Sequence, residues 1–162
     1  MNRVLCLLLG TIIALCGIAA TQAVQPSLPP GSDKYSGMYS FLRDGEFVQV
    51  TVEDQGKVTG FISRFGDLDS DKGAFLDQFF KEGKLEGTKL TFSTQTVHGV
   101  WFAFKGIIDR GEGKHRGDEA YYVLKGTLTE NAIDNNKISS SRSREVAFKS
   151  FPQDMTPNAP KD

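Results

Sequence analysis

Cysteine is nearly absent from this chain of 162 residues: its two cysteines, Cys6 and Cys16, both lie in the apolar N-terminal segment. If that segment is removed on export, the remaining chain has no cysteine. Disulfides, thiolate nucleophiles and cysteine-ligated metals are then excluded. The fold must be held together by burial of apolar surface, and the roughly 115 patterned residues from Tyr35 to Phe151 are enough for one modest core.

The net charge is small and histidine is rare. The chain has 19 basic and 20 acidic residues, and losing Arg3 with the leader leaves a net charge of −2. Nucleic-acid binding needs a basic face and is therefore not expected. His98 and His115 are too few for a zinc site, so we expect no metal and no cofactor. We interpret His98 as a turn residue and favour a non-enzymatic protein. Two enzymatic alternatives stay open: a general base at His98, and a hydrolase whose paired carboxylates come from distant strands.

The first 23 residues have the pattern of a signal peptide. The segment from Val4 to Ala20 carries no charge, and small residues precede a cleavage site after Ala23. The apolar run is shorter than the roughly 20 residues of a membrane span. Cys16 follows Leu15, where a lipoprotein signal has a small residue, so a lipid anchor is disfavoured. These features predict export to the periplasm or the medium, with no membrane span after cleavage.

Proline marks both ends of the remaining chain. Residues 24–34 contain three of the six prolines, and residues 152–162 contain the other three. Such segments do not pack regularly, so we predict a tether at 24–34 and a loose tail at 152–162. Residues 35–151 form one domain between them, which we expect to be monomeric.

Apolar residues alternate with polar ones through most of this domain, which is typical of β-strands. Short turns rich in glycine and asparagine separate the segments. The predicted strands are 37–43, 46–53, 57–65, 79–86, 89–96, 99–109, 119–130 and 138–150. Neighbours joined by short turns pair with each other, and closing the sheet removes its exposed edges. The sequence predicts an all-β fold, a single eight-stranded antiparallel up-and-down β-barrel.

Two local features complete this prediction. A glycine beside apolar residues recurs in "KVTGFIS", "KLEGTKL", "FKGIID" and "LKGTLTE", and glycine lets a strand bend sharply or approach another chain closely. In residues 71–83, Phe75, Leu76, Phe79 and Phe80 have helical spacing. We expect a short helical turn at 73–78 followed by a strand, and a strand through the whole segment is the alternative.

The pattern "GKVTGF" at 56–61, followed by hairpin after hairpin, resembles the calycin-type barrels, the lipocalin and avidin group. Gly37-Met38-Tyr39 opens the first strand where lipocalins carry Gly-any-Trp, and Tyr39 departs from that pattern. The segments "LDQFF", "GKLEGTKLTFST", "VHGVWFAFKG" and "EAYYVLKGTLTE" are similar to small exported bacterial β-barrel proteins without assigned activity. The resemblance implies fold and location, and no avidin ligand residues map onto this chain.

The stretch "VHGVWFAFKGIID" at 97–109 raises the question of a binding site. Its alternation puts Phe102 and Phe104 on one face and Trp101 on the other. The simpler interpretation is a packed core, because aromatic stripes usually pack. The functional alternative, and our first hypothesis for the protein, is a mouth that binds a small, largely apolar ligand and is lined by Phe61, Phe92, Phe102, Phe104 and Tyr122. Trp101 is also among the predicted ligand-binding residues. Arg142 and Arg144 either meet an anionic ligand together with Tyr122 or belong to a solvated sheet face. A protein-interaction module with a contact patch around Trp101 is the second hypothesis.

Two further motifs are weak. Asp67, Asp69 and Asp71 alternate as in calcium loops, but Lys72 stands where such loops need glycine, which favours a solvated acidic loop. The tripeptide at 116–118 spells Arg-Gly-Asp, and three letters recur by chance.

Overall fold

The computed structural model describes residues 33–67, 71–134 and 136–153. The predicted signal peptide, Cys16, most of the tether and most of the tail lie outside these residues. The expectations of cleavage and export therefore stay predictions.

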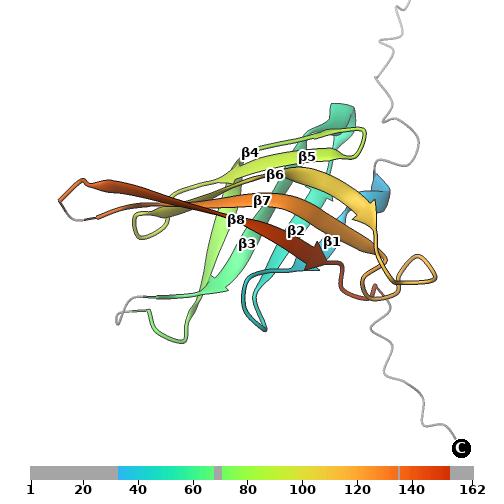
Figure 1. The fold of residues 1–162 in the computed structure, drawn as a ribbon, viewed down its shortest axis with the longest axis horizontal. Helices are drawn as coiled ribbons and strands as arrows, with labels where there is room; N and C mark the ends of the chain where they lie inside the picture. Colours follow the sequence, from blue (N-terminus) through green and yellow to red (C-terminus); the bar gives the residue numbers. More distant parts are fainter. Residues whose placement is uncertain (1–32, 68–70, 135, 154–162) are drawn as a thin grey trace, which may run out of the picture.

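Eight strands follow one another along the chain, and each pairs antiparallel with the next (Figure 1). The predicted all-β, up-and-down topology is confirmed. Short 3-10 turns lie at Asp33–Tyr35 (η1) and Asp54–Gly56 (η2), and no helix in the described part of the chain is long and apolar enough to span a membrane. The strands are β1 (Gly37–Ser40), β2 (Phe47–Val52), β3 (Val58–Phe65), β4 (Phe75–Glu86), β5 (Lys89–Thr94), β6 (Val100–Arg110), β7 (Tyr122–Ile133) and β8 (Ser139–Lys149).

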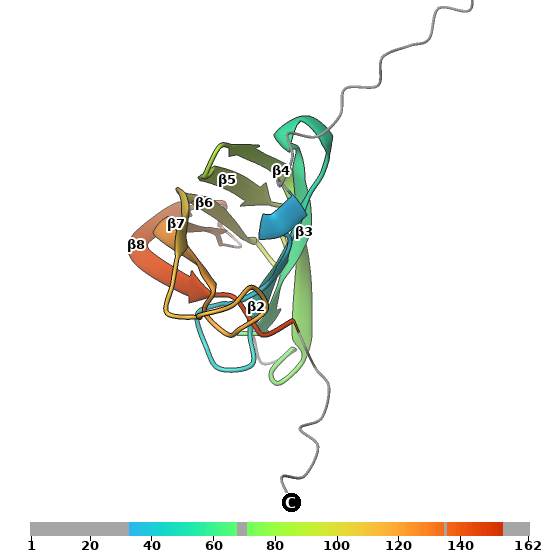
Figure 2. The ribbon, with the colours of Figure 1, turned by 90° about the vertical axis from the view of Figure 1, so that its right-hand side faces the viewer.

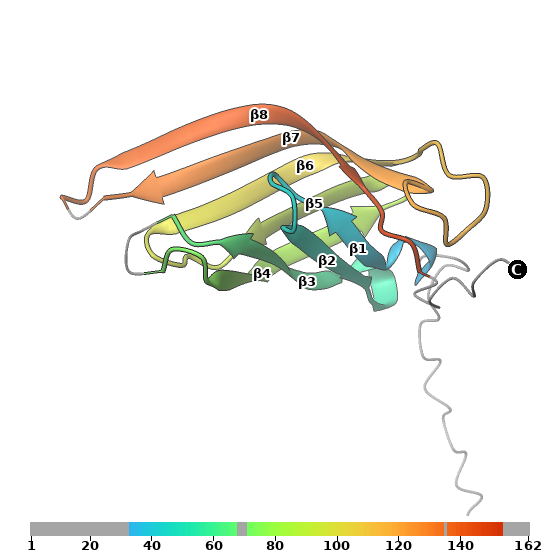
Figure 3. The ribbon, with the colours of Figure 1, turned by 90° about the horizontal axis from the view of Figure 1, so that it is seen from below.

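The curled sheet closes along a short seam between β1 and β8. Tyr39 and Ser150 form a single bridge, and the Phe151 amide donates to the Met38 carbonyl at 2.8 Å. Because β1 has only 4 residues and β8 has 11, most of β8 pairs with β7 alone among the described strands. Figures 2 and 3 show the curled sheet and the β7–β8 hairpin that projects beyond its neighbours. The barrel is therefore only partly closed.

Apolar side chains on the inner face fill the middle of the barrel. Phe92 stacks on Phe80 and on Phe104, with ring centroids 4.4 and 5.2 Å apart. Phe41, which directly follows β1, packs against Phe148 of β8 at 5.1 Å inside the seam. Each fully buried ring of this kind contributes roughly 1.5–3 kcal/mol. The rest of the core comes from aliphatic residues on alternate positions, among them Val48, Val50, Ile62, Leu90, Leu124 and Leu128.

Glycines stand where two strands approach too closely for a side chain. A Cβ on Gly60, whose φ is +150°, would lie 1.9 Å from the Gln49 carbonyl oxygen. Gly106 and Gly126 face each other across β6 and β7, and a Cβ on Gly126 would lie 2.4 Å from the Gly106 Cα. Three of the four glycines in the sequence repeat thus allow close strand contact, whereas Gly87 forms the β4–β5 turn with φ +64°.

The predicted helical turn at 73–78 is wrong, because β4 begins at Phe75 and pairs with β3 from its first residue, Phe75 opposite Phe65. Residues four apart share a face in a strand as well as in a helix. Phe75 and Phe79 lie on the outer face, while Phe80 lies inside. The spacing that indicated a helix was therefore equally compatible with the strand that forms.

Candidate ligand-binding mouth

One end of the barrel, which we call the mouth, gathers most of the buried polar groups. It is formed by the β1–β2 connection (41–46), the described parts of the β3–β4 connection (66–67 and 71–74), the β5–β6 connection (95–99) and the projecting β7–β8 hairpin. The opposite, closed end carries the long β6–β7 connection (111–121).

Glu46 anchors the first wall. Its side chain is buried, with the residue 2% exposed. Its Oε1 accepts hydrogen bonds from Arg43 Nε at 2.8 Å and from the Phe65 amide at 3.0 Å. Arg43 also donates to Asp67 at 3.2 Å. A buried carboxylate needs such partners, so Glu46 fixes the two connections rather than offering a free charge.

Arg64 forms the base of the second wall and is 4% exposed. Its Nε donates to Gln78 Oε1 at 2.7 Å and its Nη1 to Asp67 Oδ2 at 2.8 Å. Its guanidinium lies 5.7 Å from the ring centroid of Phe102, over the ring. Gln78, which is fully buried, donates to the Val100 carbonyl at 2.9 Å. This network holds β3, β4 and β6 together above the aromatic core.

The inner face of the β7–β8 hairpin is the third wall, and its hydrogen bonding is incomplete. Arg144 Nη2 donates to Glu130 Oε2 at 2.6 Å, whereas Arg144 Nε is buried and has no hydrogen-bond partner. Arg142 lies opposite Glu130 in the register, is exposed, and has no ion-pair partner among the described residues. The wall therefore offers one unsatisfied donor and one unpaired cation.

Apolar side chains also contribute to the mouth. Leu42, in the β1–β2 connection, and Val100, at the start of β6, are partly buried and pack on the core. Val146 packs on the core too but lies deeper, opposite Gly126. The mouth therefore combines the apolar rim of Leu42 and Val100 with the cationic hairpin wall.

His98 and Asp71 tie two connections of the mouth together. His98 Nδ1 lies 2.5 Å from Asp71 Oδ2. His98 has φ +49°, a conformation typical of turns, as its position before Gly99 predicted. With Asp67 bonded to both arginines and Asp71 to His98, the calcium-like spacing has a different role, although Asp69 lies outside the described residues. In the described ranges no cluster of three or more His, Cys, Asp or Glu side chains suits a metal ion.

Three of the predicted ligand-binding residues lie in the barrel core. Phe92, Phe102 and Phe104 are 2–4% exposed and face inward. Phe92 and Phe104 stack on each other, and Phe102 packs edge-on against Phe41 at 5.4 Å. They support the mouth from below instead of lining an open cavity at their own level.

Phe61 and Tyr122 do not join that group. Phe61 lies on the outer face of β3, between Phe47 and Phe79, with ring centroids 5.8 and 5.5 Å away. Tyr122 lies at the closed end, where it packs against Tyr35 at 5.0 Å. The expected set of five therefore spans both faces and both ends of the barrel. Tyr122 and Arg142 do not share a ligand site either, because Arg142 lies at the mouth and Tyr122 at the opposite end.

Trp101 points outward, as its alternation with Phe102 predicted. It is partly buried and lies opposite Asn131 of β7. A contact patch at Trp101 remains a hypothesis.

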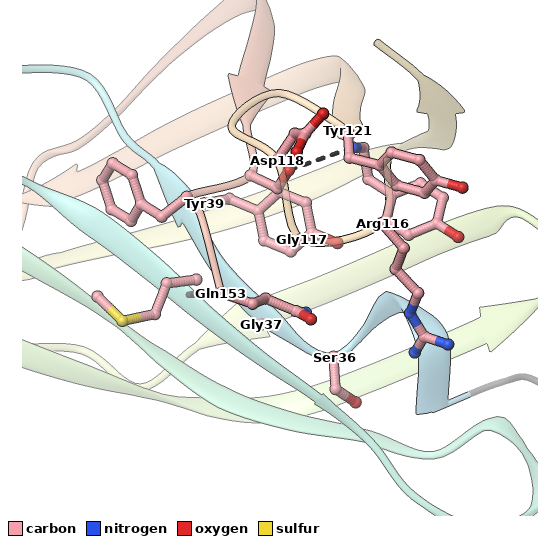
Figure 4. Close-up of a pocket in the computed structure, with 12 residues that line it drawn as sticks. Ser36, Gly37, Tyr39, Arg116, Gly117, Asp118, Tyr121 and Gln153 are labelled. Atoms are coloured by element: carbon pink, nitrogen blue, oxygen red, sulfur yellow. Dashed lines mark hydrogen bonds between the residues drawn. The ribbon is translucent and has the colours of Figure 1, made fainter. Parts of the chain in front are cut away.

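The closed end has a small cavity beneath the β1–β8 seam (Figure 4). Tyr39, Arg116, Tyr121 and Gln153 are among its lining residues, and its volume of about 20 Å³ suits a single water molecule. Asp118 accepts from the backbone amides of Lys114 and His115, and the His115 amide in particular lowers its pKa. Asp118 therefore stabilises the connection, which accounts for the Arg-Gly-Asp tripeptide in structural terms.

A larger hollow, about 570 Å³, lies on the outer surface of β4–β7. Its lining is mostly polar and includes the ion pair of Lys84 and Glu86, and Ile107, which is 42% exposed, also lines it. It is an open concavity of the twisted sheet and lacks the buried polar groups found at the mouth.

Sequence reasoning missed Glu46, Arg64 and Gln78. Arg64 and Gln78 occupy inward positions in strands whose other inward residues are apolar, such as Ile62 and Phe80. A charged or amide side chain at an inward strand position was the available signal, because such a group needs a buried partner.

Comparison with known proteins gives the fold alone. No protein-family model matches the chain, and no curated protein matches it in sequence. Among solved structures, the rhizavidin–biotin complex has a TM-score of 0.53 at 11% identity, covering 76% of this chain and 98% of that one. Intact afifavidin in its apo form has a TM-score of 0.54 at 11% identity, covering 78% of this chain and 88% of that one. A crystal structure of rhizavidin has a TM-score of 0.53 at 12% identity, covering 78% of this chain and 89% of that one. The protein therefore has an avidin-like β-barrel fold, with sequence identity too low to assign it to that family.

Proposed function

We propose that the protein is an exported, non-enzymatic binding module that holds a small amphipathic molecule at the mouth. The observation that carries the proposal is Arg144 on the inner face of the hairpin wall, whose Nε is buried without a hydrogen-bond partner. Leu42 and Val100 supply apolar surface at the same end of the barrel. A buried unsatisfied donor costs about 1–3 kcal/mol unless a ligand or water satisfies it. One similar fold is described in complex with biotin, which adds support for a small ligand.

The ligand's chemistry follows from the walls. The apolar core is filled below the mouth, so a wholly apolar molecule would find little surface beyond the rim. Arg142 and Arg144 together exceed the single charge of Glu130, which favours an anionic group. We therefore refine the largely apolar ligand predicted from sequence to one with an apolar body and a carboxylate or comparable anion.

Titration calorimetry with two probes of opposite charge tests this proposal. Dodecanoate should bind, and dodecylamine should bind at least about tenfold more weakly, because charged hydrogen bonds to arginine require an anion. Arg142→Met and Arg144→Met should each weaken dodecanoate binding. Lys105→Met, which removes an exposed charge from the outer face of β6, is the matched control. Equal affinity for both probes, or loss in the control alone, would overturn the proposal.

Export is a separate part of the proposal. It is supported by the signal-like sequence of residues 1–23. The mature protein, isolated from the periplasm or medium, should begin at Val24 when its N-terminus is sequenced. Recovery of the full-length chain in the cytoplasm alone would contradict it.

A further inference from the structure

Aromatic side chains gather on the outside of the barrel as well as inside it. Phe47, Phe61 and Phe79 form a continuous row across β2, β3 and β4, with ring centroids 5.8 and 5.5 Å apart. Phe65 and Phe75 form a second pair at 4.4 Å on β3 and β4. We call these five residues the outer phenylalanine face. Phe75 is 51% exposed and Phe79 is 54% exposed.

The outer positions of the other half of the sheet are different in kind. Most of them are polar, such as Lys105, Thr127, Thr129 and Ser143 on β6, β7 and β8, and the outward Trp101 and Ile107 of β6 are isolated exceptions. Polar outer positions are the rule for an antiparallel sheet with one face in water. A contiguous group of half-exposed aromatic rings on one half alone marks an interaction surface.

The size of the face fits a modest protein interface. An aromatic side chain presents roughly 150–250 Å² in full, so Phe75 and Phe79, about half exposed, together offer on the order of 200 Å². The partly buried rings add to this. The sum is a sizeable share of the roughly 800 Å² that each partner buries in a standard complex, with polar residues supplying the rim.

The charges beside Phe79 indicate what the partner is. Asp77 precedes it by two residues and Lys81 follows it by two, and both are exposed. Neither has an ion-pair partner among the described residues of the chain, where eight ion pairs are found. A two-fold axis through Phe79 sets two β4 strands antiparallel across the interface. It brings Asp77 of each copy near Lys81 of the other. Lys81 lies where the register of β4 with β5 shifts, between Phe80 and Glu82, and the exposed Glu82 follows it farther from the axis.

We propose that the outer phenylalanine face binds a second copy of this chain, in a symmetric dimer with the two β4 strands face to face. Such an interface is self-complementary, as a two-fold axis requires. An anionic membrane would leave Asp77 unpaired, whereas a second copy supplies an opposite charge to both Asp77 and Lys81. This inference replaces the monomer expected from sequence and does not depend on ligand binding at the mouth.

Sedimentation velocity of the full exported chain, from about 1 to about 100 μM, tests the proposal through a charge swap. Wild type should show a concentration-dependent dimer. Asp77→Lys and Lys81→Asp should each weaken dimerisation by about tenfold or more, because each places like charges opposite one another. The double variant D77K/K81D restores both pairs with the signs exchanged, so its dimerisation constant should return close to that of wild type.

Two apolar variants complete the experiment. Phe79→Ser should abolish the dimer, and Ile107→Ser, at a residue 42% exposed on β6, should leave it unchanged. Circular dichroism checks that each variant is folded. If Phe79→Ser does not fold, the charge-swap variants alone test the dimer. A monomer at every concentration, a double variant no better than the single ones, or binding of the monomer to vesicles of phosphatidylglycerol instead of self-association would each overturn the proposal.

Discussion

The barrel contains two phenylalanine clusters that differ only in the face they occupy. Phe92, Phe102 and Phe104 are 2–4% exposed and form the core, whereas Phe75 and Phe79 are 51% and 54% exposed on the outside. Both clusters come from alternating strands of similar composition. Their comparison shows that position relative to the barrel axis, and not residue type, decides whether an aromatic ring stabilises the fold or is left for a partner.

The largest effect should come from emptying the core. Phe104 touches Phe92 on one side and Phe148 on the other, at 5.2 and 6.2 Å between centroids. Phe104→Ala should lower the free energy of unfolding by about 3–5 kcal/mol, because it removes buried apolar area and leaves a cavity. Urea unfolding followed by circular dichroism measures this, and a loss below about 1 kcal/mol would show that the inner cluster is loosely packed.

Filling the core should have the next largest effect. A Cβ on Gly106 would lie 2.6 Å from Phe104 Cζ and 2.2 Å from the Lys125 carbonyl oxygen. Gly106→Ala should destabilise the protein by about 1–3 kcal/mol through overpacking. Gly73→Ala is a control for the steric part of this effect, because no atom lies within 4 Å of the added Cβ. Its backbone φ of +81° still disfavours alanine. If Gly106→Ala left the free energy of unfolding unchanged, β6 and β7 would have to be able to move apart.

A polar group on the inner side should matter less. Tyr39 is 1% exposed and donates to the Tyr35 carbonyl at 2.7 Å. Tyr39→Phe should cost about 1 kcal/mol at neutral pH. Burial raises the pKa of Tyr39, so the folded state favours the neutral phenol. Wild-type stability should therefore fall as the pH rises above about 10.

The pH dependence supplies the control for that variant. In Tyr39→Phe the free energy of unfolding should decrease less steeply with rising pH, because the phenol that ionises is absent. The difference in the free energy of unfolding between wild type and Tyr39→Phe should therefore become smaller in alkaline solution. Unfolding curves at neutral pH and above pH 10 would measure it. Parallel pH profiles would mean that Tyr39 ionises equally well in the folded barrel.

The smallest effect should come from the outer cluster. Phe79→Ala should change the free energy of unfolding of the dilute monomer by no more than about 1 kcal/mol, because about half of the ring is already in water. The same urea experiment measures it at a concentration below that of self-association. A loss equal to that of Phe104→Ala would erase the difference between the two clusters.

Much of the fold was predictable because it depends on local patterns. Alternation and turn residues located all eight strands, and short connections gave their order. The partial closure was not foreseen, because it follows from the lengths of β1 and β8 at the seam. The start of β4 was misjudged because Phe75 and Phe79, four residues apart, fit a strand and a helix equally well.

The candidate site was less predictable. The burial of Phe102 in the core was predictable from alternation along its strand. Phe61 lies on the opposite face, because Val58 and Ile62 occupy the inward positions of β3. Tyr122 was placed at the mouth although the strand direction of β7 puts its first residue at the closed end. Arg64 and Gln78, 14 residues apart in the chain, meet only because β3 and β4 pair in this register.

The sequence by itself determined an antiparallel β protein of one domain, because strand periodicity and tight turns are properties of neighbouring residues. Only the tertiary structure decided which phenylalanines face the axis and which face water, where the seam closes, and which polar groups meet at the mouth. Those outcomes depend on how the sheet curls and on the register between strands, which bring together residues that no local pattern connects.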